Sequence, residues 1–194
     1  GWHTRVRLRA LTDHEVIPVG VADWGMLPEL VGSADAVLHF AGVNRGTDAE
    51  VEQGNTRLAQ DLAEAVNRAP GAPTLVYANT IQAGNGTPYG TGKAFAATIL
   101  GQAASAKGSP FANVALPNLF GEHGRPGYNS FVATFAHKVA TGEHPEVQDR
   151  EVSLLHVQDA SRALIDELEG TGHREARPAA TPTSVTAVLQ ILTS

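Results

Sequence analysis

Strand-like and helix-like segments alternate along this chain, and this alternation limits its folds more than any other feature. Short runs rich in branched and aromatic residues alternate with longer segments whose apolar residues recur every three or four positions. The expected strands cover residues 14–19, 35–42, 74–78, 111–116 and 152–157. The expected helices cover residues 2–12, 24–31, 48–69, 90–107, 128–141, 160–169 and 184–192, with a loop at 171–183.

This pattern predicts an α/β fold built on a doubly wound parallel sheet, with helices on both faces. No internal repeat or linker divides the 194 residues, a length that suits one domain. We therefore expect a single domain over residues 1–194, in which residues 120–194 contribute a small lobe on the substrate side.

Composition excludes several classes of protein. The formal net charge is −6 without any basic block, which argues against a nucleic-acid or membrane-surface partner. Without cysteine the chain has no disulfides, thiolate metal sites or cysteine nucleophiles, and its eight histidines lack metal-site spacing, so we expect no metal. No run is long and apolar enough to span a membrane and no signal pattern opens the chain, so the predicted location is cytoplasmic.

Chemistry in such a fold belongs to the loops that follow the strands. One of them leads from Thr80 to Tyr89-Gly90-Thr91-Gly92-Lys93, which places Tyr89 and Lys93 on one helix face. A tyrosine, with a free pKa near ~10, needs a nearby cation for acid–base work, and Lys93 is one turn away. Thr80 would hydrogen-bond the same substrate oxygen and help to polarise a carbonyl during hydride transfer. The alternative is a packed Tyr89 ring and a solvated Lys93.

Four motifs support the catalytic interpretation by their order along the chain. Asp35–Gly42, Asn79–Gln82, Tyr89-x-x-x-Lys93 and Leu116–Gly121 resemble the successive motifs of the extended short-chain dehydrogenase/reductases, which include sugar-nucleotide epimerases, dehydratases and ketoreductases. More narrowly, residues 41–45, 80–83, 117–121 and 125–135 resemble the reductase domain of bifunctional enzymes that reduce a 4-keto-deoxy sugar nucleotide in N-acetyl-L-fucosamine synthesis.

The resemblance implies a Rossmann-like, NAD(P)-dependent reductase or epimerase that acts on a keto group of a nucleotide-linked sugar and forms a homodimer. It makes Tyr89 the general acid, Lys93 its pKa partner and ribose ligand, and Thr80 the hydroxyl that orients the carbonyl. The implied cofactor-binding residues are Gly1, His39, Ala41, Gly42, Lys93 and Asn118. The implied substrate-binding residues are Gln82, Asn118, Arg125, Tyr128 and Asn129.

Several of these residues also have structural interpretations. Asn118 after Pro117 is a turn former, Asn129 a helix cap, and His39 a hydrogen-bonding residue at a strand end. His156 and Asp159 could form a metal or catalytic pair, but a structural role at a helix start is favoured. Ile81-Gln82 lacks the acidic pair of the family's dehydratases, which favours reduction or epimerisation.

The start of the chain departs from the family pattern. The family opens with a strand and a glycine-rich turn that holds the pyrophosphate, whereas here Gly1 aligns with the third glycine of that turn. We therefore expect an N-terminally truncated Rossmann-like fold, split into two half-sheets with unpaired edges. The segment Gly20–Asp23 has no basic residue and a late acidic one, so NAD and NADP both remain alternatives. The alternative function is a relative that has lost dinucleotide binding and acts as a cofactor-free catalyst or binding module.

Overall fold

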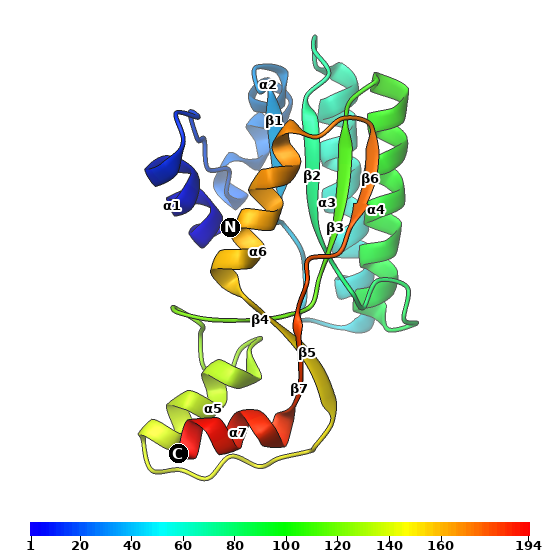
Figure 1. Ribbon diagram of the computed structural model, residues 1–194. Helices are drawn as coiled ribbons and strands as arrows, with labels where there is room; N and C mark the ends of the chain where they lie inside the picture. The colour runs from blue at the N-terminus through cyan, green and yellow to red at the C-terminus, as the bar shows by residue number, and fades with distance from the viewer.

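Four parallel strands form the larger of two sheets in the computed structural model, which describes residues 1–194 (Figure 1). Their order in the sheet is β1-β2-β3-β6, and each neighbouring pair is parallel. These strands are β1 (Ala36–His39), β2 (Thr74–Thr80), β3 (Phe111–Leu116) and β6 (His173–Ala176). All six residues of β3 are buried, as the central position of the strand requires.

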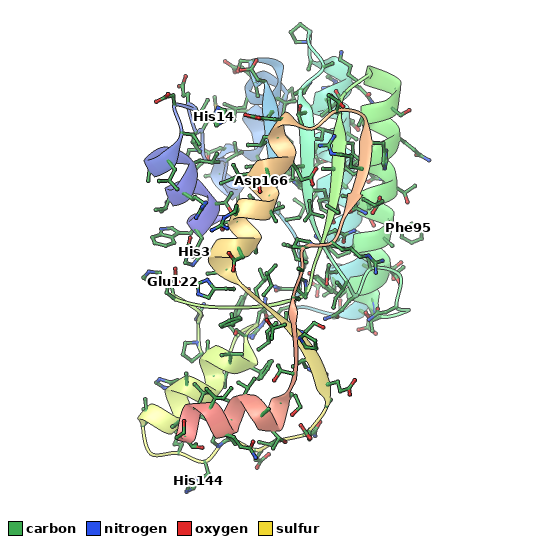
Figure 2. The ribbon with its side chains drawn as sticks, in the orientation of Figure 1. His3, His14, Phe95, Glu122, His144 and Asp166 are labelled. Atoms are coloured by element: carbon green, nitrogen blue, oxygen red, sulfur yellow. The ribbon has the colours of Figure 1, made fainter.

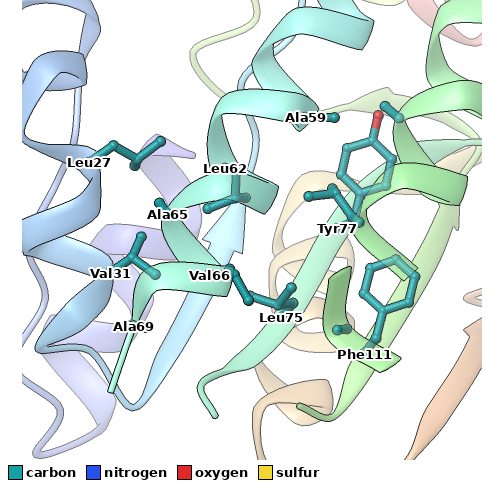
Figure 3. Packing of buried hydrophobic residues seen from close by; sticks show 13 residues of the cluster. Leu27, Val31, Ala59, Leu62, Ala65, Val66, Ala69, Leu75, Tyr77 and Phe111 are labelled. Atoms are coloured by element: carbon teal, nitrogen blue, oxygen red, sulfur yellow. The ribbon is translucent and has the colours of Figure 1, made fainter. Parts of the chain in front are cut away.

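Two long helices, α3 (Asp48–Arg68) and α4 (Pro88–Lys107), run parallel to each other and cover one face of this sheet. Thr47 and Glu50 form a capping box that starts α3, and Gly108 in the left-handed conformation ends α4. Figure 3 shows how the buried faces of these helices pack with Tyr77 and Phe111 from the sheet. This cluster fixes α4, and with it the helix start that follows β2.

The other face is covered by α6 (Val157–Asp166), which packs on Val76, Val114 and Leu116 of the sheet. The N-terminal helix α1 (Trp2–Leu11) lies against α6, and the Thr4 hydroxyl donates to the Ser161 hydroxyl at 3.2 Å. Helices on both faces of a parallel sheet make this the doubly wound α/β fold that the sequence predicts.

A second sheet of three strands, in the order β4-β5-β7, lies below the first in Figure 1. Phe135 of α5, Val152 and Leu154 of β5, and Val185 and Val188 of α7 form its own small core. Its elements are β4 (Asn118–Phe120), β5 (Glu151–His156), β7 (Thr181–Ser184), α5 (Phe131–Ala140) and α7 (Val185–Thr193). Between β5 and β7 the chain returns to the larger sheet as α6 and β6.

Three expectations about strands are wrong. Residues 14–19 form no strand, because β1 is the end of its sheet and no strand lies beside it to pair with them. The larger sheet is continuous and is not split into two half-sheets. The predicted loop at 171–183 contains β6 and most of β7, four-residue strands whose mainly polar residues give little hydrophobic signal.

The remaining elements are short. A 3-10 helix, η1 (Val21–Met26), leads into α2 (Leu27–Gly32), which packs on α3, and η2 (Glu167–Glu169) follows α6. No helix has the length and apolar character that crossing a membrane requires.

Candidate functional site

The carboxyl ends of β1, β2 and β3 meet at one edge of the larger sheet, and most of the predicted site residues follow them (Figure 1). His39 is paired in register with Tyr77, and Thr80 with Leu116. The loops after these strands therefore begin side by side, as expected for a parallel sheet.

Thr80 is the last residue of β2 and is held by its neighbours. Its hydroxyl oxygen accepts a hydrogen bond from the Gln82 backbone N–H at 3.2 Å, and its own backbone N–H donates to the Asn79 side chain at 2.9 Å. Asn79 in turn donates to the Asn113 side chain at 2.9 Å, and Asn113 to Glu175 at 2.8 Å. This row of two amides and the Glu175 carboxylate crosses three strands and fixes the backbone that presents Thr80.

Tyr89 lies in the first turn of α4 because Thr87 caps that helix, accepting from the Gly90 N–H at 3.1 Å. Gly90 has no room for a side chain, since a Cβ would overlap the Asn85 side chain and the Gln82 carbonyl oxygen. The loop between β2 and α4 is thus folded tightly onto the helix start. Burial raises the pKa of Tyr89, so its hydroxyl is protonated at neutral pH, as a proton donor must be.

Lys93, one turn after Tyr89, is buried and points back to the strand. Its Nζ donates to the Ala78 carbonyl at 2.8 Å and lies 4.1 Å from the centroid of the Tyr77 ring. Burial lowers the pKa of Lys93 to about 7. The solvated lysine of the structural alternative is therefore wrong.

His39, at the end of β1, is buried and stacks on Tyr77 with 5.4 Å between ring centroids. Burial first, and then the charge of Lys93, lowers the pKa of His39 to about 3, so this imidazole is neutral. Its Nε2 has no hydrogen-bond partner in the protein. Nε2 therefore does not support the structural alternative, in which His39 forms a hydrogen bond at the strand end.

Ala41 and Gly42 follow in a turn that packs on α3. Asn55 of α3 clamps this turn: it accepts from the Val43 N–H at 3.2 Å and donates to the Val43 carbonyl at 2.6 Å. A Cβ at Gly42 would lie 3.0 Å from the Asn55 side-chain oxygen. A side chain at Gly42 would therefore crowd Asn55, which favours glycine where the backbone passes this close to the helix.

Arg45 joins the loop after β1 to the loop that contains Tyr128. Its guanidinium donates to the carbonyls of Gly127 and Tyr128 at 3.0 Å each and lies 4.3 Å from the centroid of the Tyr128 ring. Arg125 lies 5.5 Å from the same centroid, and the Tyr128 hydroxyl donates to Asn44 at 3.4 Å. Two guanidinium groups thus gather around one exposed aromatic ring, an arrangement that suits an anionic or aromatic ligand.

Asn118 and Asn129 differ from their structural alternatives. Asn118 begins β4 instead of a turn, and its side chain donates to the Ser153 carbonyl at 3.3 Å. Asn129 is exposed and caps nothing, because Ser130 is the cap of α5 and accepts from the Ala133 N–H at 3.3 Å. Gln82 is likewise exposed at the start of the loop that follows β2.

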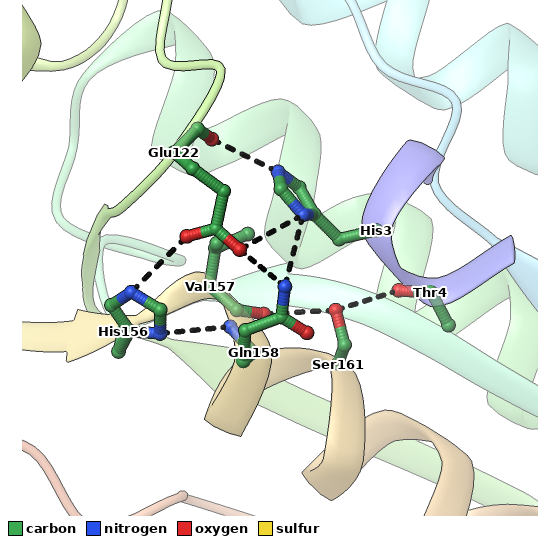
Figure 4. A network of polar contacts seen from close by, with 7 residues as sticks. All are labelled: His3, Thr4, Glu122, His156, Val157, Gln158 and Ser161. Carbon is green, nitrogen blue, oxygen red and sulfur yellow. Dashed lines mark hydrogen bonds and ion pairs between the residues drawn. The ribbon is translucent and has the colours of Figure 1, made fainter. Parts of the chain in front are cut away.

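Gly1 precedes α1 and lies near the end of β1, since a Cβ at Gly1 would be 3.9 Å from the ring of Phe40, the residue after that strand. A polar network ties this helix start to the rest of the protein (Figure 4). The His3 Nε2 donates to the Glu122 backbone carbonyl at 3.1 Å, and the Glu122 carboxylate lies 3.3 Å from the His156 ring. Gln158 donates to the same carboxylate. The side-chain hydrogen bond from Gln158, first among several causes, lowers the pKa of Glu122.

His156 and Asp159 have the roles of a helix start. The His156 ring accepts from the Gln158 N–H at 3.3 Å as the cap of α6, and Asp159 lies in its first turn, 3.8 Å from Arg162. No group of three or more His, Cys, Asp or Glu side chains is arranged to hold a metal ion.

Sequence reasoning missed two parts of this site. Arg45 belongs to the motif at residues 41–45, but the motif alone predicts no contact for it, because its partner Tyr128 is 83 residues away. The amide row from Asn79 through Asn113 was also missed; its signal is a pair of polar residues inside two otherwise apolar strands.

Comparison with known proteins shows the family of this chain. The sequence pattern of the NAD dependent epimerase/dehydratase family matches residues 3–170. The chain belongs to this family. Its membership confirms the resemblance predicted from the motifs around Thr80, Tyr89 and Lys93.

Individual relatives extend the comparison. This epimerase/dehydratase-family chain is 36% identical over 160 residues to the UDP-2-acetamido-2,6-beta-L-arabino-hexul-4-ose reductase of Pseudomonas aeruginosa, covering 80% of this chain and 43% of the relative. The capsular polysaccharide assembling protein CapF of Staphylococcus aureus superposes with a TM-score of 0.81 at 27% identity, over 100% of this chain and 54% of that protein. The UDP-glucose 4-epimerase of Thermus thermophilus, solved with NAD, has the same fold, with a TM-score of 0.75 at 19% identity over 98% of this chain and 78% of that one. The chain spans about half the length of the first two relatives.

Proposed function

We propose that this chain is a nicotinamide-dependent reductase that acts on the keto group of a nucleotide-linked sugar, with Tyr89 as the general acid. The observation on which this proposal depends is the arrangement of Thr80, Tyr89 and Lys93 at the carboxyl end of β2. The name of the Pseudomonas aeruginosa relative, a 4-ulose reductase, favours reduction over epimerisation.

The residues present fit a nicotinamide dinucleotide. Ala41 has a single side-chain carbon and Gly42 has none, so a flat ligand can approach the backbone of this turn closely. Lys93 has one protein acceptor for its three N–H donors, which leaves it able to bind a ribose hydroxyl. When bound, the cofactor would supply the hydride.

The proton chemistry belongs to this chain's own side chains. The Thr80 hydroxyl, already an acceptor for the Gln82 N–H, is free to donate its proton to the substrate carbonyl oxygen. Tyr89 donates the proton that this oxygen acquires as the carbonyl is reduced. The Lys93 ammonium then stabilises the phenolate that Tyr89 becomes.

Arg45, Arg125 and Tyr128 support a nucleotide-linked substrate. Guanidinium groups pair with phosphate oxygens in a planar, two-pronged geometry, and an aromatic face stacks on a base or a sugar. These three residues lie on the loops after β1 and before α5. We place the diphosphate of the substrate there, with Gln82, Asn118 and Asn129 toward the sugar.

A second candidate is a relative without dinucleotide binding. It is favoured by Asp23, the acidic residue of the cofactor-selecting segment, whose carboxylate accepts from the Gly20 N–H at 3.0 Å and so caps its own helix. In this candidate the same loops would bind the nucleotide-linked sugar alone.

Cofactor binding separates the two candidates. We would titrate the purified chain with NADH and, separately, with NADPH, and follow the fluorescence of the reduced cofactor. The reductase proposal predicts that at least one cofactor binds with a titration midpoint in the micromolar range. It also predicts that this cofactor is consumed when a UDP-linked 4-keto sugar is added. Flat titrations with both cofactors would contradict the proposal and favour the second candidate.

A further inference from the structure

The buried charge of Lys93 lies against an aromatic ring and not against a carboxylate. Its Nζ lies 4.1 Å from the centroid of Tyr77, and the two side chains are 4% and 1% exposed. A cation over a ring face is attracted by the ring quadrupole, most strongly where water is excluded. The contact is therefore in the environment where it has the largest effect.

Few other groups face this ammonium. On β1, His39 stacks on Tyr77 and is neutral, and on α4 itself Tyr89 is protonated one turn before Lys93. Helix α3 approaches α4 here through the Glu52 backbone and Asn55, at Gly92. Lys93 has no carboxylate within ion-pair distance, and burial is the cause of its lowered pKa.

We propose that Tyr77 is a positioning residue of this site, whose ring face holds the Lys93 side chain charged and in place beside Tyr89. A carboxylate in the same position would neutralise the ammonium and compete with the Tyr89 phenolate for it. A neutral ring stabilises the cation without cancelling its charge, so the full charge stays available to Tyr89. The inference rests on the proposed function, because Lys93 serves catalysis only if Tyr89 is the acid.

Burial opposes the charge of Lys93, so the groups that stabilise the cation decide whether it stays protonated. Burial lowers the pKa of Lys93 to about 7 in the folded chain, so a further fall would leave most of the amine uncharged at neutral pH. The Ala78 carbonyl is its one hydrogen-bond acceptor. The Tyr77 ring face is thus the second group that opposes loss of the proton.

A titration of the lysines tests this without any substrate. The chain has three lysines, Lys93, Lys107 and Lys138, so carbon-13 labelling at the lysine ε position gives three NMR signals. Lys107→Arg and Lys138→Arg assign them. The midpoint of Lys93 would be measured in the parent chain, in Tyr77→Phe, which keeps the ring, and in Tyr77→Leu, which removes it.

We expect Tyr77→Leu to lower the Lys93 midpoint by about one pH unit, while Tyr77→Phe stays within a few tenths of the parent. A titration midpoint of Lys93 that is unchanged or raised in Tyr77→Leu would overturn the inference. An equal fall of the midpoint in Tyr77→Phe would also overturn it, because that result would assign the effect to the hydroxyl of Tyr77. If Tyr77→Leu fails to fold, Tyr77→Met fills the space with a flexible side chain and gives the same comparison. Because no cofactor or substrate is present, this result is independent of the test of the reductase function.

Discussion

At the scale of single residues, the site consists of buried polar groups whose surroundings determine their protonation. Burial raises the pKa of Tyr89 and so keeps its hydroxyl protonated. The same cause lowers the pKa of Lys93 to about 7. Two groups whose pKa values shift in opposite directions are thus one helical turn apart, as expected for a general acid and the cation that stabilises its phenolate. Burial of Lys93 has a consequence for stability as well as for chemistry.

Replacement of Lys93 by methionine should stabilise the fold while it abolishes turnover. A lysine whose folded pKa is about 7, against 10.5 when unfolded, makes folding progressively less favourable as pH falls from 10.5 to 7, and the full penalty is present below pH 7. Lys93→Met removes that penalty, so we expect it to raise the free energy of unfolding by about 1–3 kcal/mol at neutral pH. The difference should shrink as pH rises toward 10.5. Urea denaturation at both pH values measures it, and a less stable variant at neutral pH would refute this account.

At the scale of elements, the buried parts of the fold were predictable and the edges were not. The apolar runs at β2 and β3 are strands, and the amphipathic segment at α3 is a helix, because burial of each face dictates its pattern. Residues 14–19 have the composition of a strand, but no strand lies beside β1 to pair with them. The strand β6 pairs with β3, although its residues are mostly polar and are not typical of a strand. Pairing across a sheet depends on distant segments, which local patterns do not contain.

The site follows the same division. Spacing within one helix placed Tyr89 and Lys93 correctly, since both belong to α4. Contacts between segments far apart in sequence, such as Arg45 with Tyr128 and Lys93 with Tyr77, needed the folded chain.

The close packing of α3 on α4 at Gly92 predicts that a larger residue there destabilises the fold. A Cβ at Gly92 would lie 2.8 Å from the Glu52 carbonyl oxygen and 3.2 Å from the Asn55 Cβ, both on α3. Gly92→Ala must therefore push the helices apart, and we expect a loss of about 1–3 kcal/mol of unfolding free energy. Gly71→Ala, where nothing lies within 4 Å, is the matched control and should change stability by less than about 0.5 kcal/mol. Equal urea midpoints for the two variants would show that the helices tolerate the methyl group.

At the scale of the whole molecule, the helices beside the site have an exposed outer face. Phe95 points away from the sheet on the outer side of α4, as Figure 2 shows, and is 52% exposed. It lies with Ile99 in a shallow groove between α3 and α4. The other residues that line this groove are mostly polar or charged, so Phe95 is its one strongly exposed large apolar side chain. An exposed aromatic ring favours association, and identical chains associate most often about a two-fold axis.

We therefore expect a homodimer through the α3–α4 face. Phe95→Asp should shift the chain from dimer to monomer in size-exclusion chromatography with light scattering. Leu11→Asp, at an exposed apolar residue of α1, should leave the mass unchanged. A monomeric parent chain, or equal masses for the parent and Phe95→Asp, would rule out this interface.

Tyr89→Phe tests most directly whether Tyr89 is the general acid. This change removes the hydroxyl but keeps the ring that packs at the start of α4. With a UDP-linked 4-keto sugar and the reduced cofactor that the titrations identify, we predict that kcat falls by about 10²–10⁴-fold, because that is the range typical of general acid–base catalysis. The cofactor midpoint should stay within about twofold of the parent, since the ring and the Lys93 contacts remain. Turnover within a few-fold of the parent would contradict the assignment of Tyr89 as the acid.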